Sequence, residues 1–442
     1  MKRLLIISPN FQPINAPDMQ RVRMSLSHYQ ANGWEPVVMA VGERWQTGAV
    51  EPELLATIPN GIRVIPVPAL PIGWSRWLGL GTLGLRALPF LWWRGTRLLR
   101  REKFDLAFFS NTQFITFTLG RFWLRTFGLP YVLDVQDPWR TGNYERPGAP
   151  QPPGGWKYQF ARFLAWAFEG PSFAGAAAVM SVSPAYLSAL SARYPGFGAK
   201  PSAVIRFGAS LSDVLQARAL PKPAHPFHRE NGEIHIVYTG ASGPIMPHAL
   251  TALFRALRTY RTAQPELAGR LRLHFIGTSY AAAGQAKFSV LPLAVECGVG
   301  ELVSEVPHRV GFLEALQLQQ ASDVLLLPGS IDPAYSPSKI YQYYLAGRPI
   351  LGLVFRGSVM EGLLDELRCA FMVRLDPGGP SGEAHSSLLE FFGLAVAGAL
   401  GASLPTRNES EFRRSFLAEE LTRRQCGLFD EALASSARHA RQ

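Results

Sequence analysis

The residues whose types and spacing could do chemistry gather in one stretch, residues 321–354, which read ASDVLLLPGSIDPAYSPSKIYQYYLAGRPILGLV. Residues 323–327 have the composition of a buried strand. Ser336 is a favourable N-cap, Pro337 suits the first helical position and Gly347 ends a helix, so the spacing predicts about three helical turns. In a parallel α/β sheet, such a helix begins beyond the carboxyl end of its strand, where ligands bind.

The start of this helix is predicted to bind an anion, because free N–H groups and the helix dipole favour negative charge there. Ser336 and Ser338 add hydrogen-bond donors, and Lys339 adds a positive charge. Lys339 and Gln342 are three residues apart and share one helical face. Lys339 is therefore expected to contact a phosphate, with Gln342 reaching a neighbouring polar group. An ordinary capped helix with a surface lysine is the alternative.

The composition describes a folded chain of more than one domain. The chain has 442 residues, of which 47% are apolar and 17% charged, so long disordered stretches are excluded. Its three cysteines, Cys297, Cys369 and Cys426, lie too far apart for a disulfide framework or a zinc motif. The first apolar run, residues 4–7, is too short for a signal peptide, and no apolar run is long enough to span a membrane. A cytoplasmic location is expected.

Short apolar runs alternate with helix-length segments along the whole chain, which predicts parallel sheets covered by helices on both faces. The predicted strands are residues 4–8, 36–41, 63–67, 105–109, 131–135, 177–182, 234–239, 271–277, 323–327, 350–354 and 370–375. Two such series predict an α/β fold of two doubly wound domains. The expected division is residues 1–205, residues 206–410 and a C-terminal helical extension, residues 411–442.

The positive charge is concentrated in the first half of the chain. Residues 1–200 hold 21 Lys and Arg against 11 Asp and Glu, whereas the rest is nearly balanced. Within residues 72–103, tryptophans and arginines are interleaved; the predicted contacts are Trp74, Trp77, Arg94, Arg97 and Arg101. This composition favours a helix seated on an anionic membrane surface, with nucleic acid less favoured because of the apolar bulk. A helix that packs its apolar residues inward and exposes a solvated basic face is the alternative.

A family resemblance adds to these patterns. SPSKIYQYYLAGRPIL, residues 336–351, resembles the donor-site segment of retaining glycosyltransferases of family 4. Other segments similar to that family follow in its order: FQP (11–13), NGWEPV (32–37), LDVQDPW (133–139), VMSVS (179–183), VIRFGA (204–209) and YTG (238–240). Each motif is weak, and the ordered set covers nearly the whole chain.

The resemblance implies the GT-B architecture, in which two Rossmann-like domains face a cleft and a C-terminal helix packs back toward the N-terminal domain. It implies a nucleotide sugar on the C-terminal domain, a glycan or lipid-linked acceptor on the N-terminal domain, and neither a cofactor nor a bound metal. The donor-binding residues are then Gly240, Ser242, Tyr335, Ser336, Ser338, Lys339 and Gln342. Lys339 is one of the two expected catalytic residues, because preorganised positive charge stabilises a departing diphosphate.

Asp137 is the other expected catalytic residue. It follows the strand at residues 131–135 and could orient or deprotonate an acceptor hydroxyl, or it could cap the next turn. Arg21, Trp139 and Arg140 complete the expected acceptor side. Asp134, inside the strand, is expected to be a structural partner, and the Pro- and Gly-rich loop at 142–155 is expected to close over the acceptor.

The sequence also departs from the family pattern. Gln342 stands where the family has a glutamate that holds the ribose, and Ala334 stands where an earlier glutamate is usual. Gln342 can still accept from one hydroxyl and donate to another. The alternative function is therefore a weakened GT-B protein that binds nucleotide sugar or glycan without turnover. A sugar-nucleotide epimerase is a third interpretation, disfavoured because no paired acid and base are found near the helix.

Overall fold

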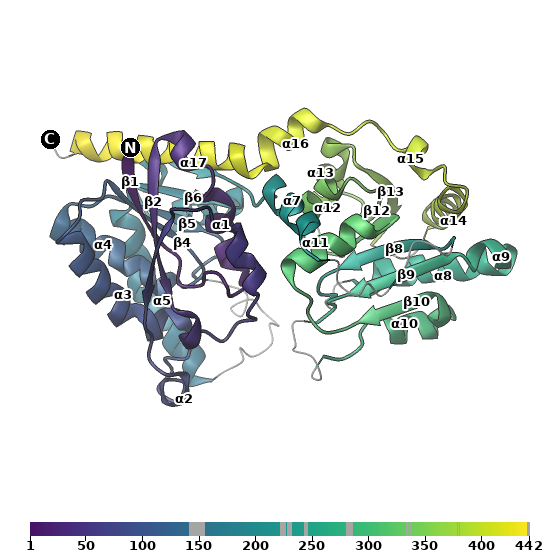
Figure 1. The fold of residues 1–442 in the computed structure, drawn as a ribbon, viewed down its shortest axis with the longest axis horizontal. Coiled ribbons are helices and arrows are strands. Elements are labelled where there is room, and N and C mark those ends of the chain that lie inside the picture. The colour runs from purple at the N-terminus through teal and green to yellow at the C-terminus, as the bar shows by residue number, and fades with distance from the viewer. Residues whose placement is uncertain are drawn as a thin grey trace. The chain divides into compact units, whose positions relative to one another are not determined.

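The computed structural model of the protein describes residues 1–140, 155–221, 227, 232–242, 246–279, 286–332, 335, 338–377, 379 and 381–439. The chain divides into two compact units. Unit 1 comprises Met1–Ser210 and Leu417–Gln442, and unit 2 comprises Leu211–Phe416 (Figure 1).

Unit 1 is built on a parallel seven-stranded sheet in the order β3-β2-β1-β4-β5-β6-β7. Its strands are β1 (Lys2–Ile7), β2 (Trp34–Val41), β3 (Arg63–Val67), β4 (Leu106–Ser110), β5 (Tyr131–Val135), β6 (Ala178–Ser181) and β7 (Ser202–Val204). Its α-helices are α1 (Gln20–Ser25), α2 (Ile72–Ser75), α3 (Leu83–Leu99), α4 (Phe117–Phe127), α5 (Trp156–Gly175), α6 (Pro184–Arg193) and α17 (Ala418–His439). The strand order reverses between β1 and β4, which is the switch point of a doubly wound sheet.

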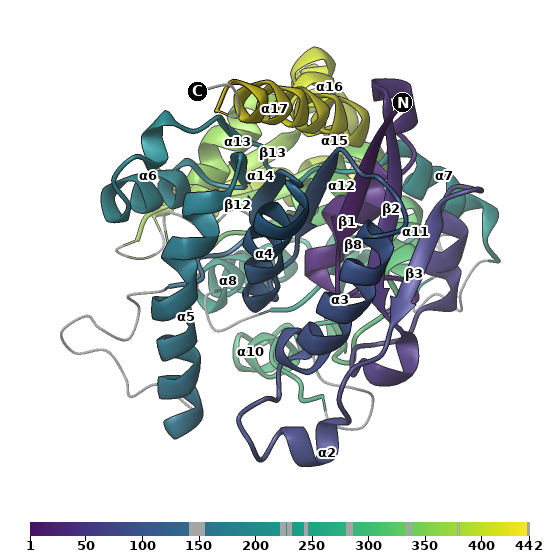
Figure 2. The ribbon, with the colours of Figure 1, turned by 90° about the vertical axis from the view of Figure 1, so that its left-hand side faces the viewer.

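Both faces of this sheet are buried, which explains why its strands are apolar without alternation. Leu5 and Ile7 of β1 face a core shared with α3, α4 and α5. Leu4 and Ile6 face a second core on the opposite side, shared with α1 and α17. Figure 2 looks onto α3, α4 and α5, which cover the first of these faces. The period-2 alternation of a strand therefore sends successive side chains into two separate cores.

The last helix, α17, is an integral part of unit 1. Phe429 packs against the rings of Trp34 and Phe108, with ring centroids 5.5 and 5.0 Å apart. Gln425 accepts a hydrogen bond from the Tyr29 hydroxyl at 3.2 Å and donates one to Ser25 at 3.0 Å. The expectation that a C-terminal helix packs back on the N-terminal domain is confirmed.

Unit 2 is built on a parallel six-stranded sheet in the order β10-β9-β8-β11-β12-β13. Its strands are β8 (Ile234–Thr239), β9 (Leu271–Ile276), β10 (Val303–Val306), β11 (Val324–Pro328), β12 (Ile350–Phe355) and β13 (Ala370–Leu375). Its α-helices are α7 (Leu211–Ala219), α8 (Pro247–Ala263), α9 (Pro265–Ala268), α10 (Leu291–Glu296), α11 (Phe312–Ala321), α12 (Lys339–Ala346), α13 (Val359–Leu367), α14 (Gly382–Val396), α15 (Leu400–Ser403) and α16 (Glu409–Phe416). The switch point here lies between β8 and β11.

The predicted fold class, two doubly wound α/β domains, is confirmed by these two sheets. Two strands, β7 and β10, were not predicted. The C-terminal segment differs in a second way, since it forms two helices that belong to different units. Phe412 and Phe416 of α16 stack on Tyr344 and Tyr341 within unit 2, whereas α17 joins unit 1.

Candidate active site

The switch point of the second sheet brings the loop after β8 beside the start of α12. The Lys339 side chain extends from the first residue of α12 toward this loop, and its Nζ donates to the Tyr238 hydroxyl at 3.2 Å. The ammonium also lies 5.0 Å from the centroid of the Tyr238 ring. The Tyr238 hydroxyl donates in turn to the Ala241 carbonyl at 2.7 Å. The predicted helix and the predicted YTG segment therefore meet at one place.

Lys339 is a half-buried cation, and it has no acidic partner among the residues that the structure describes. Burial lowers the pKa of its ammonium to about 8, because the charged form loses water. Among the described residues no carboxylate lies within ion-pair distance of Lys339. An ammonium that is desolvated and unneutralised gains more from a bound anion than a surface lysine does. The alternative of an ordinary surface lysine is therefore disfavoured.

Gly240 is required by its backbone angle and by Lys339. Its φ is +122°, which L side chains rarely adopt, and a Cβ built there would lie 2.2 Å from Lys339 Cε. The absence of a side chain lets the lysine stem cross the loop.

A second set of contacts holds the loop in place. The Thr239 N–H donates to the Tyr343 hydroxyl at 3.0 Å, and Gln319 donates to the Thr239 hydroxyl at 2.9 Å. Burial raises the pKa of Tyr343 to about 12, so its hydroxyl stays protonated. These residues of α11 and α12 position Lys339 through the loop and were not predicted from the sequence.

The other predicted donor residues differ in how far they are exposed to solvent. Ser338 is exposed and Gln342 is half-buried, and among the described residues the Gln342 side chain makes no hydrogen bond. Tyr335 is partly buried against the core of unit 2. Gly347 adopts φ 74° and ends α12 as predicted. Ser336, like Pro337 and Ala334, lies outside the described residues.

Ser242 contacts a neighbouring helix start that already holds an anion. Its hydroxyl lies 2.7 Å from that of Ser289, which precedes α10. The buried carboxylate of Glu305 accepts from the backbone N–H groups of Val290 and Leu291 at 2.9 and 2.7 Å. Glu305, which sequence reasoning missed, therefore fills the start of α10. The start of α12 carries Lys339 instead.

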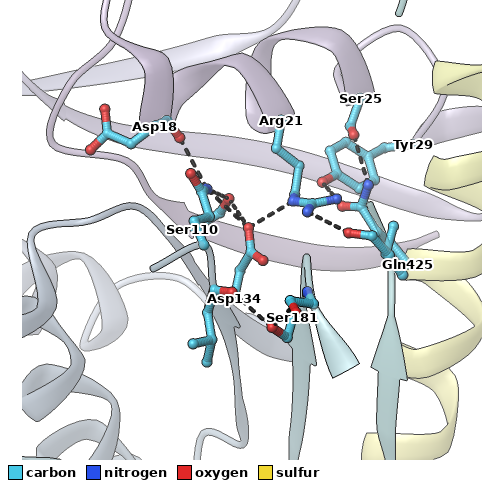
Figure 3. A network of polar contacts seen from close by, with 12 residues as sticks. Asp18, Arg21, Ser25, Tyr29, Ser110, Asp134, Ser181 and Gln425 are labelled. Atoms are coloured by element: carbon cyan, nitrogen blue, oxygen red, sulfur yellow. Dashed lines mark hydrogen bonds and ion pairs between the residues drawn. The ribbon is translucent and has the colours of Figure 1, made fainter. Parts of the chain in front are cut away.

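In unit 1, Arg21, which is expected on the acceptor side, is held within the fold. It is buried, and its Nε lies 2.8 Å from Asp134 Oδ2 (Figure 3). Its Nη2 donates to the Ile205 carbonyl at 2.6 Å. Asp134 also accepts from Ser110 at 2.8 Å and from Gln136 at 3.0 Å. These contacts of Arg21 are with the fold of unit 1, and Asp134 pairs with it there, as its position inside a strand predicts. The acceptor-side role of Arg21 stays a prediction.

Asp137 remains accessible. Its side chain is exposed, and its pKa is raised, first because surrounding protein removes part of its water and second because Asp18 carries a like charge. No hydrogen bond to its carboxylate occurs within the described part of the chain, so the capping alternative finds no support there. A carboxylate left open to solvent can accept a proton from a hydroxyl brought to it.

Trp139 and Arg140 follow Asp137 and are held by the fold. Trp139 stacks on Phe114 with centroids 5.8 Å apart, and the Arg140 N–H donates to the buried Glu169 carboxylate at 2.9 Å. The predicted closing loop lies outside the described residues, apart from its last position, Gly155.

The arginine- and tryptophan-rich segment divides into exposed and buried parts. Trp77, Arg94, Arg97 and Arg101 are exposed, as are Trp92 and Trp93 of α3. Arg86 of the same segment is buried and donates to the carbonyls of Leu70 and Trp45, so it serves the fold. The side chain of Trp74 is outside the described part. None of the helices described is both long and apolar enough to cross a membrane.

Solved structures define the class of this fold. A trehalose-6-phosphate synthase from Burkholderia multivorans is 12% identical over 100% of this chain and 99% of its own, with TM-score 0.57. HepE from Anabaena in complex with UDP is 13% identical over 100% and 99%, with TM-score 0.51. The N-terminal domain of trehalose-6-phosphate phosphatase from Candida albicans is 12% identical over 98% and 97%, with TM-score 0.58. The two sheets and these matches define the GT-B fold.

The family match lies in the sequence of unit 1. Residues 20–208 match the family described as glycosyl transferase 4-like domain. No curated protein matches the chain significantly. Residues 20–208 therefore carry a glycosyl transferase 4-like domain, and for these residues the resemblance stated from the motifs is confirmed.

Proposed function

We propose that the protein moves a sugar from a nucleotide-sugar donor to a hydroxyl of a glycan or lipid-linked acceptor, with retention of anomeric configuration and without a bound metal. The observation that carries this proposal is Lys339, a desolvated cation with no acidic partner among the described residues, at the switch point of unit 2. The structure of HepE with the same fold was determined with UDP. A diphosphate would supply the negative charge that no described carboxylate supplies to Lys339.

Lys339 would act on the leaving group. Departure of a nucleoside diphosphate builds negative charge on phosphate oxygens, and a cation already in place stabilises that charge without reorganisation. The backbone N–H groups at the start of α12 and the dipole of that helix act in the same direction. Gly240 lets the phosphates approach the backbone, and Gln342 is assigned to the ribose hydroxyls.

The test of donor chemistry is release of nucleoside diphosphate from a panel of nucleotide sugars. We expect release by the wild type and its loss in Lys339→Ala. Lys287→Ala is the matched control, because Lys287 is an exposed lysine of the same unit. Nucleotide binding without any release, with or without acceptor, would instead favour the alternative of a binding protein. Addition of EDTA should leave the rate unchanged.

Asp137 is assigned to the acceptor hydroxyl, as orienter or base. Asp137→Asn should lower the transfer rate and leave nucleotide affinity unchanged, because the two groups belong to different substrates. Since its pKa is raised, the acid limb of the wild-type rate should lie above the ordinary aspartate range, with activity lost as pH falls. If the transfer rate of Asp137→Asn falls at low pH as that of the wild type does, Asp137 is not the titrating group of the mechanism. The anomer of the product, read by NMR, tests retention.

A peripheral contact with the anionic cytoplasmic face of a membrane is also proposed. Its support is the exposed surface of α3, where Trp92 and Trp93 stand beside Arg94 and Arg97, with the exposed Arg101 just after the helix. Tryptophan at headgroup level and arginine at lipid phosphates is the arrangement of interfacial helices.

Vesicle sedimentation tests this contact. Anionic vesicles should sediment the protein at low salt, and neutral vesicles should not. Exchange of Arg94, Arg97 and Arg101 for Gln should abolish sedimentation. The same exchange at Arg255 and Arg258, exposed on α8, should have no effect. Equal loss in both variants would mean that only net charge matters.

A further inference from the structure

Unit 1 contains a groove that the proposed donor chemistry does not use. It has a volume of about 1380 Å³ and lies between the segment after α2, the start of α3, the turn η5 (Phe114–Thr116) and α5. The segment α2 and the first turns of α5 lie at the same end of unit 1 (Figure 2). There the Trp156 ring packs against Gly79, one of the residues that line the groove. Trp139 and Arg140 of the expected acceptor side also line it.

Aromatic side chains stand exposed along this groove. On α5, Phe163 is 57% exposed and Trp166 is 65% exposed, with their rings 6.4 Å apart. Trp77, beside the groove residues Arg76 and Gly79, is 83% exposed. Large apolar side chains gathered on one surface of a folded protein mark a binding site. These exposed aromatic side chains favour a ligand with a hydrocarbon chain or another apolar group.

The same groove is positively charged. Of its described lining residues, five are basic and none is acidic: Arg76, Arg140, Lys157, Arg162 and Arg193. The buried carboxylate of Glu169 pairs with Arg193 and also accepts from the Tyr194 hydroxyl at 2.8 Å and from the Arg140 N–H. One carboxylate thus holds the Arg193 guanidinium and the Arg140 backbone in place. Among the described residues, the Arg140 guanidinium has no carboxylate partner and is the positive charge left for a ligand.

We infer that this groove binds a lipid phosphate, with the phosphate at Arg140 and Arg193 and the hydrocarbon chain along Phe163 and Trp166. The lining of α5 runs from residue 157 to residue 166, which at 1.5 Å per residue is about 14 Å of helix. That length suits a chain-like ligand better than a compact sugar. The exposed tryptophans and lysine at the rim match an interfacial surface.

This inference rests on the proposed function and narrows its acceptor from a glycan or lipid-linked acceptor to a lipid carrying a phosphate or diphosphate. It also places a lipid contact at α2 and α5, in addition to the exposed face of α3. The glycosyl transfer step itself is unchanged: a hydroxyl oxygen of the group attached to the lipid phosphate attacks the anomeric carbon, the bond from that carbon to the nucleoside diphosphate breaks, and the hydroxyl proton passes to a base.

The experiment measures binding of farnesyl phosphate by calorimetry. Farnesol, its apolar part, and inorganic phosphate, its anionic part, are measured separately for comparison. We expect farnesyl phosphate to bind at least tenfold more tightly than either part. Phe163→Ser and Trp166→Ser, both exposed positions, should each weaken it severalfold, and Arg140→Ala should reduce it to the level of farnesol. Phe288→Ser, an exposed aromatic of unit 2, is the matched control and should have no effect.

Several results would overturn the inference. Equal affinity for farnesol and farnesyl phosphate would show that the phosphate contributes nothing to binding. Equal affinity of the groove variants and the control for farnesyl phosphate would show that it binds outside the groove. Tighter binding of a single-stranded oligonucleotide that displaces farnesyl phosphate would assign the groove to nucleic acid. Nucleoside diphosphate binding is measured on the same samples. Its loss in Lys339→Ala with lipid binding retained separates this groove from the donor site.

Discussion

Each unit holds a positive charge near the carboxyl edge of its sheet, buried in unit 1 and half-buried in unit 2, and the two charges have different surroundings. In unit 1, Arg21 is paired with Asp134 at 2.8 Å, and Asp134 receives further hydrogen bonds from Ser110 and Gln136. In unit 2, Lys339 has a neutral phenol as its hydrogen-bond partner. A buried charge that the protein neutralises holds the fold together. One that the protein leaves unneutralised is available to a ligand.

Removal of the two charges should therefore change the stability of the protein in opposite directions. Removal of Arg21 leaves an unpaired buried carboxylate, whereas removal of Lys339 leaves only a tyrosine hydroxyl that still donates to Ala241. Stability and ligand affinity are the two quantities that separate these cases.

The largest effect is expected for the ion pair of unit 1. Arg21→Met should lower the free energy of unfolding by about 3–5 kcal/mol, because Asp134 would remain buried without its partner. Urea unfolding measures the loss. The double variant Arg21→Met with Asp134→Leu should recover most of it. A loss below about 1 kcal/mol in the single variant would contradict a structural role for the pair.

Removal of the unit 2 charge should cost affinity and not stability. Lys339→Met should weaken nucleoside diphosphate binding about 10- to 100-fold, the ~1.5–3 kcal/mol expected of a charged hydrogen bond. The free energy of unfolding at pH 7 should rise by about 1–2 kcal/mol, because a lowered lysine pKa means that the folded state carries the charge at a cost. Calorimetry and urea unfolding give both values. A less stable variant would mean that Lys339 is also structural.

The pKa of Lys339 predicts a pH dependence of nucleotide affinity. The free protein loses the Lys339 charge as pH rises through about 8. Affinity should therefore be constant below that pH and fall by about tenfold per pH unit above it, until the pKa of the bound lysine is reached. Titrations from pH 7 to 9.5 avoid protonation of the phosphates. Lys339→Arg should retain its affinity over the same range, and a parallel decline would place the titrating group elsewhere.

The smallest expected effect is at Gln342. Gln342→Glu should tighten nucleotide binding about 2- to 10-fold, since a carboxylate accepts from two ribose hydroxyls and a charged hydrogen bond is stronger than a neutral one. A 2′-deoxyribonucleotide should lose the gain, which provides the control. The same gain with both nucleotides would assign Gln342 to some group other than the ribose.

Much of the fold could be predicted because each strand buried on both faces is a short run of apolar residues. The strands that were missed lack that signature. Ser202–Val204 is only three residues long, and Val303–Val306 carries Ser304 and Glu305. The break between α16 and α17 was also missed, because one amphipathic stripe continues through both helices. Only the partners show that Phe412 packs in unit 2 and Phe429 in unit 1.

By itself, the sequence determined the parallel α/β class, the family resemblance and the helix that ends at Gly347, because apolar runs, caps and motifs are local features of the chain. Tertiary structure decided which charges are neutralised. Arg21 and Asp134 are more than a hundred residues apart in the sequence, as are Lys339 and Tyr238. Their roles depend on which side chains the sheet topology brings within a few ångströms, since charge interactions act through space and not along the chain.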